Sequence, residues 1–305
     1  MTVEFVVIGA QKAATTSLHA ALSTVPGVYM PPGERAFWED PDFYERKWEA
    51  FGVGRHERVK GVKRPDILCR PELRSRVVES LPEARFIAVL RDPISRAVSA
   101  YFHLVRHAHL PHVGLDVALE RSIASFGTGV HSEFASLIEY GLYGKHLEAW
   151  YQMVPPERLL VLPQSAIRVN LESALRSCCM HLGVEISARG LGEVPRANEN
   201  SGIYDDRWIR WLRLAHRVKT RPLEGGGSRR VPRALPLKSV GVGMTAIGER
   251  LAKGDAAIMK PSTSTLTALQ DIFREDSAIL ERLVGPELMD WDPQFPQMNP
   301  DRGSM

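Results

Sequence analysis

Short apolar runs alternate with longer segments of helical periodicity through the first half of this chain. Short apolar runs between turn residues or charges are typical of strands buried in a parallel sheet. They predict strands near residues 4–8, 27–30, 59–63, 85–90 and 158–162. Segments with apolar residues at helical spacing predict helices near residues 15–24, 71–80, 93–107, 115–124, 142–153 and 171–182. This alternation predicts a three-layer α/β fold with a central, mostly parallel five-stranded sheet flanked by helices.

The pattern is weaker after residue 198. Residues 204–219 predict an amphipathic helix, and residues 264–291 predict a final one. Between them, residues 221–242 contain consecutive glycines, several prolines and a basic run, which is typical of a mobile segment. No linker divides the 305 residues, so we expect a single domain over residues 1–305 with a mobile basic insertion at about 221–242. This insertion either closes over a ligand or forms a solvated loop.

The segment from Phe5 to Leu18 predicts an anion-binding site. An apolar strand ends at Gly9, a loop of small residues carries Lys12, and Thr15 and Thr16 open a helix. The backbone N–H groups of such a loop and the positive end of the helix dipole point at the same place. Either threonine can cap the helix, and Lys12 adds a full positive charge. The segment therefore predicts a phosphate or sulfate site in a P-loop-like fold.

The loop departs from the Walker pattern, in which a lysine directly precedes the hydroxyl residue that holds magnesium. Lys12 lies three residues before Thr15, and Ala14 occupies a position where a glycine is expected. The lysine therefore reaches the anion from the loop and not from the helix.

A second anion site is predicted after the strand near residues 85–90. Arg91 follows this strand directly, at the sheet edge where open α/β sheets bind ligands. Pro93 suits the first turn of a helix, and Ser99 follows about two turns beyond Arg91. A guanidinium matches the geometry of a phosphate, and the Ser99 hydroxyl can contact the same anion. The alternative is a surface pair of Arg91 with Asp92, with Ser99 on a solvated helix face.

Together, GAQKAATTSL and RDPISRAVSAYFH resemble the two nucleotide motifs of sulfotransferases that use 3′-phosphoadenosine 5′-phosphosulfate (PAPS). The resemblance is to the branch of the heparan sulfate sulfotransferases and their soluble bacterial relatives. It implies that Arg91 and Ser99 bind the 3′-phosphate, which distinguishes PAPS from ATP. It also implies that the 5′-phosphosulfate is held by Lys12, Ala13, Ala14, Thr15, Thr16 and Ser17. PAPS would then be the sulfuryl donor and PAP the product.

Two further segments match motifs of the same family. VPGVYMPPGERAFWED resembles the stretch with the sequence K-E-x-x-[FH]-F, which implies that Glu34 is the general base. KGVKRPDIL resembles the motif E-K-[ST]-P, which implies that Lys63 lies in the active site. Gly33, Val62 and Arg64 replace the usual lysine, glutamate and hydroxyl residue. Without the resemblance, Glu34 would be an exposed loop carboxylate and Lys63 a solvated lysine.

The implied reaction is an in-line displacement at sulfur, in which negative charge grows on the leaving oxygen. A lysine beside that oxygen is most effective in the transition state, and we assign this role to Lys12, shared with Lys63. Glu34 accepts the acceptor's proton. His103 is an alternative base, because it follows Ser99 by four residues on one helix face. No metal is expected, because lysine and arginine supply the positive charge.

The histidines and cysteines indicate neither a metal site nor a redox site. The histidines between residues 103 and 112 lack the spacing of a closed metal site. Cys178 and Cys179 lie in an apolar helical stretch, and Cys69 stands alone, so we expect buried free thiols.

Charge and hydropathy limit the partners and the location. The net charge of +3 argues against a nucleic-acid binder. No apolar window is long enough to span a membrane, and the Golgi members of the family have an anchor that we do not find here, so we expect a cytoplasmic protein. The expected acceptor is a hydroxyl, or an amine, of a carbohydrate or small natural product. The oligomeric state stays open.

The preferred function is therefore a PAPS-dependent sulfotransferase of class EC 2.8.2, with two alternatives. A P-loop nucleotide kinase needs an acidic residue for magnesium after a buried strand, where this chain has Arg91. A non-catalytic module that binds PAP or another nucleotide would keep Arg91 and Ser99 without placing Glu34 and Lys63 in a working cleft.

Overall fold

The structure is a computed structural model that describes residues 3–34, 37–39, 59–130, 132–185, 206–222, 230–251, 260–289 and 291. The chain divides into two compact units, each described here by itself. Unit 1 comprises Met1–Pro93, Leu142–Asn198 and Phe273–Met305, and unit 2 comprises Ile94–Gly141 and Glu199–Ile272. The single domain expected over residues 1–305 stays a prediction.

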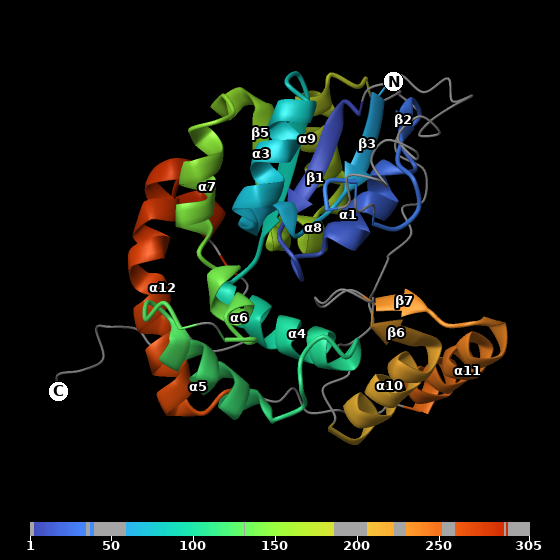
Figure 1. Cartoon of the computed structure of the whole chain (residues 1–305). Coiled ribbons are helices and arrows are strands. Elements are labelled where there is room, and N and C mark those ends of the chain that lie inside the picture. Colours follow the sequence, from blue (N-terminus) through green and yellow to red (C-terminus); the bar gives the residue numbers. More distant parts are fainter. Residues whose placement is uncertain are drawn as a thin grey trace, which may run out of the picture. The chain divides into compact units, whose positions relative to one another are not determined.

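Unit 1 is built on a five-stranded sheet, whose strand order is β2-β3-β1-β4-β5 (Figure 1). All neighbouring strands are parallel. The strands are β1 (Phe5–Gly9), β2 (Val28–Tyr29), β3 (Val59–Lys63), β4 (Arg85–Leu90) and β5 (Leu159–Pro163). Each begins within one residue of its predicted start, so the α/β class and the parallel sheet are confirmed.

The central strand β1 is buried along its whole length. Gly61 of β3 lies against it, and a Cβ at Gly61 would come within 2.0 Å of the Phe5 ring. Only a glycine therefore allows this ring to lie on β3. Because the strands are parallel, their carboxyl ends meet at one edge of the sheet, and the loops after β1, β3 and β4 all start there.

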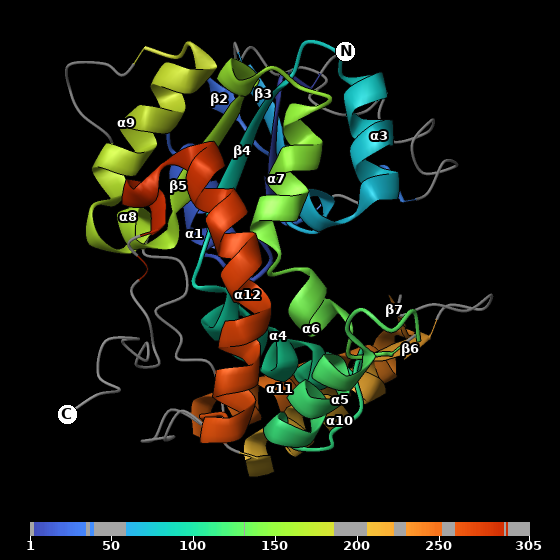
Figure 2. The same cartoon turned by 90° about the vertical axis from the view of Figure 1, so that its left-hand side faces the viewer.

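Helices cover both faces of the sheet in unit 1. Figure 2 shows the sheet nearly edge-on, with α8 and α9 on one side and α3 and α7 on the other. These helices are α1 (Thr15–Leu22), α3 (Pro71–Ser80), α7 (Tyr143–Tyr151), α8 (Gln164–Val169) and α9 (Leu171–Leu182), with short 3-10 turns η1 (Ile67–Cys69), η2 (Pro156–Arg158) and η3 (Pro286–Met289). The predicted helices over 71–80 and 171–182 agree with α3 and α9 to the residue.

Apolar packing holds this unit together. Trp150 of α7 is fully buried, and its ring centre lies 5.0 Å from that of Phe86 in β4. Its indole N–H donates to the carbonyl of Leu68, so the polar atom of the ring is satisfied. Cys178 and Cys179 of α9 are buried free thiols, as predicted. Burial raises the pKa of Cys178 to about 12.

The first turn of α7 receives its cap from a distant helix, α12 (Thr263–Val284). The backbone N–H groups of Gly144 and Lys145 each donate to the Asp276 carboxylate over 2.8 Å. No side chain caps α7 from its own N-cap position, Leu142. A carboxylate at the N-terminus of a helix also interacts favourably with the helix dipole. The contact therefore stabilises the start of α7 and attaches α12 to it.

Unit 2 is mainly helical. Its elements are α4 (Pro93–Arg106), whose first residue belongs to unit 1, α5 (Leu115–Ser125), α6 (Ser136–Glu139), α10 (Asp206–Lys219), α11 (Leu235–Leu251), the part of α12 up to Ile272, and the antiparallel strands β6 (Thr220–Pro222) and β7 (Arg230–Pro232). Two glycines bring α11 against α10. A Cβ at Gly241 would lie 2.6 Å from the Lys219 nitrogen, and one at Gly248 would lie 2.6 Å from the Trp211 ring.

The segment predicted as a mobile insertion, residues 221–242, contains regular structure where it is described. It includes β6, β7 and the first half of α11, while residues 223–229 lie outside the described residues. Within the described part of the chain, no helix is both long and apolar enough to cross a bilayer.

Candidate functional site

The loop between β1 and α1 has the backbone conformation of an anion-binding turn. Lys12 and Ala14 take left-handed conformations, with φ of 71° and 64°. Turns with left-handed residues direct neighbouring N–H groups into one concavity. The conformation of Ala14 explains why a glycine is expected there, since a left-handed residue with a Cβ costs about 1–2 kcal/mol. Ala14 is itself the N-cap and no side chain caps α1, so the prediction that a threonine caps this helix is wrong.

Lys63, the last residue of β3, lies beside this loop with only 4% of its surface exposed. Its ammonium donates to the Thr16 hydroxyl over 3.0 Å and lies 3.3 Å from Oε1 of Glu34. A buried ammonium requires such partners. The structure therefore brings three of the predicted site residues together, and Lys63 is not the solvated lysine that the sequence also allowed.

Glu34 contacts two cations. Its side chain is 40% exposed, with Oε1 facing Lys63 and Oε2 lying 3.0 Å from Nη1 of Arg64. The aromatic residues that follow, Phe37 and Trp38, are buried. Glu34 is thus a paired carboxylate at the carboxyl edge of the sheet.

Arg64, which the sequence marked only as a departure from the family motif, contacts three carboxylates. Besides Glu34, its Nε donates to Oε1 of Glu39 over 2.5 Å, and its Nη2 lies 3.6 Å from Oδ2 of Asp66. Asp66 in turn accepts a bond of 3.3 Å from the amide of Gln11, in the anion loop. Burial alone would lower the pKa of Arg64, but these carboxylates raise it. Burial raises the pKa of Asp66, and Arg64 opposes that shift.

Arg91, the first residue of the second predicted anion segment, contacts the anion loop within unit 1. Arg91 follows β4, the neighbour of β1, and it is 8% exposed. Its Nη1 donates to the Lys12 carbonyl over 3.1 Å, so the guanidinium is fixed against the anion loop. Ser99 is buried in α4, in the part that belongs to unit 2, so its contact with the same phosphate as Arg91 stays a prediction.

His19 is a site residue that the sequence analysis missed. It lies on α1, and its Nε2 is 2.9 Å from the carbonyl of Pro31, in the loop that leads to Glu34. Burial lowers the pKa of His19, and the charge of Lys63 lowers it further. His19 therefore anchors the Glu34 loop to the helix that follows the anion loop. No sequence motif marks it.

In unit 2, the alternative base His103 belongs to a cluster of histidines. Its ring centre lies 4.3 Å from that of His107, which lies 5.1 Å from His216 of α10. Burial, then the charges of Arg106 and Lys219 and the neighbouring His109, lower the pKa of His107 to about 4. Among the described residues, no group of histidine, cysteine or acidic side chains has the arrangement of a metal site.

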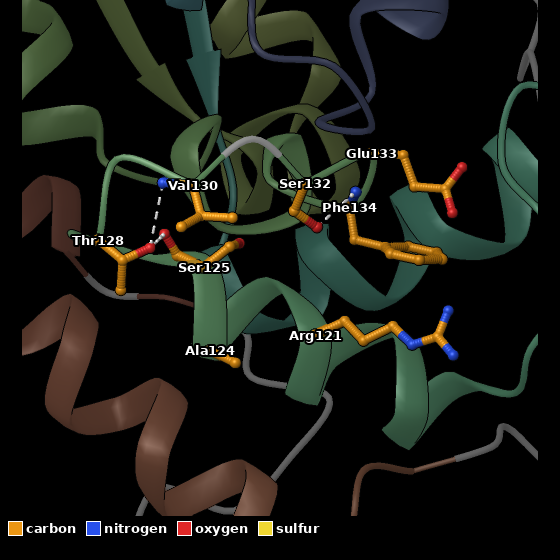
Figure 3. Close-up of a pocket in the computed structure, with 8 residues that line it drawn as sticks. All are labelled: Arg121, Ala124, Ser125, Thr128, Val130, Ser132, Glu133 and Phe134. Atoms are coloured by element: carbon orange, nitrogen blue, oxygen red, sulfur yellow. Dashed lines mark hydrogen bonds between the residues drawn. The ribbon is translucent and has the colours of Figure 1, made fainter.

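Unit 2 also contains an open pocket of about 560 Å³ between α5 and the loop after it (Figure 3). The loop is ordered by short local bonds, in which the Thr128 hydroxyl donates to the Ser125 carbonyl and accepts from the N–H of Val130. Arg121 and Glu133 are its charged residues, and none of the predicted site residues lines it. This pocket is therefore not the anion site.

Comparison with known proteins is consistent with this geometry. Residues 73–188 match the family model described as "Sulfotransferase family", a range that includes Arg91 and Ser99 but not Lys12, Glu34 or Lys63. The chain is 24% identical over 245 residues, 75% of its length, to the human bifunctional heparan sulfate N-deacetylase/N-sulfotransferase 3. It is 26% identical over 190 residues, 59% of its length, to the mouse heparan sulfate glucosamine 3-O-sulfotransferase 3B1.

The chain spans 27% of the first relative and 46% of the second. A crystal structure of a sulfotransferase from Alicyclobacillus acidocaldarius matches over 93% of this chain and 96% of that one, with a TM-score of 0.61 and 20% identity. This structural similarity concerns the fold.

Proposed function

From its membership of the PAPS-dependent sulfotransferase family, which the family match and the relatives support, we propose that the chain transfers the sulfuryl group of PAPS to an acceptor. The acceptor is a hydroxyl, or an amine, of a carbohydrate or small natural product. The relatives support a carbohydrate, because heparan sulfate appears in their names. The activity is that of class EC 2.8.2.

One observation carries this proposal, namely the contact of Lys63 with both Thr16 and Glu34. It places a buried cation between the hydroxyl of an anion loop and a carboxylate, at the carboxyl edge of a parallel sheet. Donor binding and proton removal require these groups side by side. The Glu34 side chain is also 40% exposed, so an acceptor can reach it, and a module that only binds a nucleotide does not require this.

The donor set fits a ligand with anionic groups at two ends. The amides and hydroxyls of the loop from Ala13 to Ser17, with Lys12, would hold the 5′-phosphosulfate. Arg91 would hold the 3′-phosphate together with Ser99, because a guanidinium binds phosphate through two parallel bonds. When bound, PAPS supplies the sulfuryl group, whose S–O bond to PAP breaks as a new S–O or S–N bond forms to the acceptor.

The chain's own residues then remove the proton of the acceptor and stabilise the negative charge on the leaving oxygen. Glu34 accepts the proton of the attacking hydroxyl or amine on a carboxylate oxygen, and releases it to solvent through its exposed side. Lys12 and Lys63 stabilise the negative charge that grows on the leaving oxygen. Since Lys63 also contacts Glu34, it connects the residue that removes the acceptor's proton with the residues that stabilise the leaving oxygen.

Ligand binding tests the donor assignment without an acceptor. PAP in the absence of magnesium is expected to stabilise the chain by about 2.7 kcal/mol at a hundredfold excess over its Kd. AMP lacks the 3′-phosphate that Arg91 would hold. At the same concentration as PAP, AMP is expected to stabilise the chain far less. Stabilisation by ATP with magnesium and not by PAP would instead support a P-loop kinase.

Acceptor screening with labelled PAPS tests the transfer, and Glu34→Gln tests the base. The substitution keeps the shape of the side chain and removes its basicity, so we expect transfer to fall by about 10²–10⁴-fold with unchanged PAP affinity. Glu72→Gln on α3 is the control, because this exposed carboxylate pairs with Arg70 and not with a predicted site residue. Full turnover of Glu34→Gln would refute the base assignment.

A further inference from the structure

We propose that Arg64 is a positioning residue, which holds the Glu34 carboxylate in its reactive orientation while Lys63 serves the donor. This inference rests on the proposed function, because it assumes that Glu34 is the base. Arg64 stands where the motif of the family has a hydroxyl residue, so its role belongs to this chain.

The contacts of Glu34 are divided between two cations with different surroundings. Oε1 faces Lys63, which also bonds Thr16 in the anion loop. Oε2 faces Arg64 at 3.0 Å. Lys63 is thus shared between the carboxylate and the loop that would bind the donor, while Arg64 contacts carboxylates.

This division matters once an anion occupies the loop. A sulfuryl group bound beside Thr16 would compete with Glu34 for the Lys63 ammonium, because a lysine cation turns readily towards the stronger charge. Arg64 cannot turn towards the bound anion in the same way. Its Nε and Nη2 are bonded to Glu39 and Asp66 on the side away from Glu34. It therefore keeps Oε2 of Glu34 in place.

The planar fork of an arginine suits this task. One edge of the guanidinium bonds Glu34 through Nη1, while Nε and Nη2 engage Glu39 and Asp66. Asp66 extends the connection to Gln11 of the anion loop. A lysine presents one ammonium and cannot hold three carboxylates in separate directions at once. A hydroxyl residue carries no charge and cannot replace it either.

The test compares Arg64→Gln and Arg64→Lys with the native chain and with Arg70→Gln. Arg70 is the matched control, because it pairs with Glu72 over 2.8 Å and lies 3.9 Å from Glu39, while Glu34 is not among these partners. With an acceptor from the screen, Arg64→Gln is expected to lower kcat by about 10–100-fold, since a misplaced catalytic group costs up to about 10²-fold. The Kd for PAP should change less than about twofold.

Rescue by a conservative variant gives a second readout. Arg64→Lys keeps a positive charge between Glu39 and Asp66, so it should fold like the native chain. It should recover part of the kcat that Arg64→Gln loses, while the Kd for PAP stays the same in both variants.

Three results would overturn the proposal: an unchanged kcat in Arg64→Gln, an equal loss of kcat in Arg70→Gln, or a loss confined to PAP affinity. Failure of the proposed function is a separate outcome, since it would show as absent PAP binding or absent transfer in the native chain.

Discussion

The two units differ in what holds them together. Unit 1 depends on a parallel sheet with a fully buried central strand, and the ion pairs of Glu34 with Lys63 and Arg64 lie at the carboxyl end of β3. Unit 2 depends on helices joined by polar side chains from distant parts of the chain, such as Arg106 with Glu249 and Arg213 with the carbonyl of Val105. Both units contain ion pairs and histidines, but in unit 2 the ring of His107 lies against the rings of His103 and His216, on the helices that form the unit. The stability of unit 2 should therefore depend on the protonation of His107.

The largest expected effect is on the core of unit 1. Trp150→Ala removes a fully buried ring and should destabilise unit 1 by about 3–5 kcal/mol. Trp211→Ala in unit 2 is the matched control, because that ring is 36% exposed and its main polar contact is a bond to the Met244 carbonyl. It should cost about 1 kcal/mol. Urea unfolding, with hydrogen exchange read separately in each unit, measures the loss of stability in both variants. Equal losses would contradict the difference between the two units.

The histidine cluster gives unit 2 its own pH dependence. The folded state lowers the pKa of His107 from 6.5 to about 4, chiefly through burial. Between these values the unfolded chain binds a proton that the folded chain does not. The stability present above pH 6.5 is therefore lost as the pH falls to about 4, by up to about 3 kcal/mol.

Denaturation at a series of pH values, with exchange read in unit 2, checks this prediction. His107→Gln cannot take up the proton, so its stability should fall less steeply over the same range. Native and variant chains that lose stability in parallel would show that His107 is not the cause.

The smallest expected effect is in the anion loop. Ala14→Gly relieves a left-handed residue that costs about 1–2 kcal/mol, and the extra freedom of glycine in the unfolded chain offsets about half of that gain. We expect unit 1 to gain up to about 1 kcal/mol in thermal unfolding. Ala13→Gly is the control and should destabilise, because Ala13 is buried and is not left-handed. A loss of stability in Ala14→Gly would contradict this explanation.

Sequence reasoning worked where the chain repeats a simple physical pattern. Apart from β3, whose sequence is VKGVK, the strands of the sheet are short apolar runs, and both the strands and the parallel sheet were predictable. The site followed from the ends of these runs. Lys12, Lys63 and Arg91 all lie at or just after strand ends, and the structure joins Lys63 to Glu34 and Arg91 to the Lys12 backbone.

Other features depend on contacts that no local pattern records. The first half of helix α11 was missed because the consecutive glycines, prolines and basic run of residues 221–242 suggest a loop. Within this helix Gly241 and Gly248 allow close packing on α10. Arg64 was noted only as a deviation, since its importance comes from Glu34 and Glu39, which lie near it only in the folded chain. His19 acts through a backbone carbonyl, which sequence patterns do not reveal.

The carboxylate that caps α7 has a consequence for biosynthesis. Asp276 follows Gly144 by 132 positions, so α7 leaves the ribosome long before its cap is made. At ordinary translation rates the delay is on the order of ten seconds. Throughout that time the nascent sheet carries a helix whose first amides have no carboxylate to bind. A premature stop between the two positions would leave this helix end without its cap.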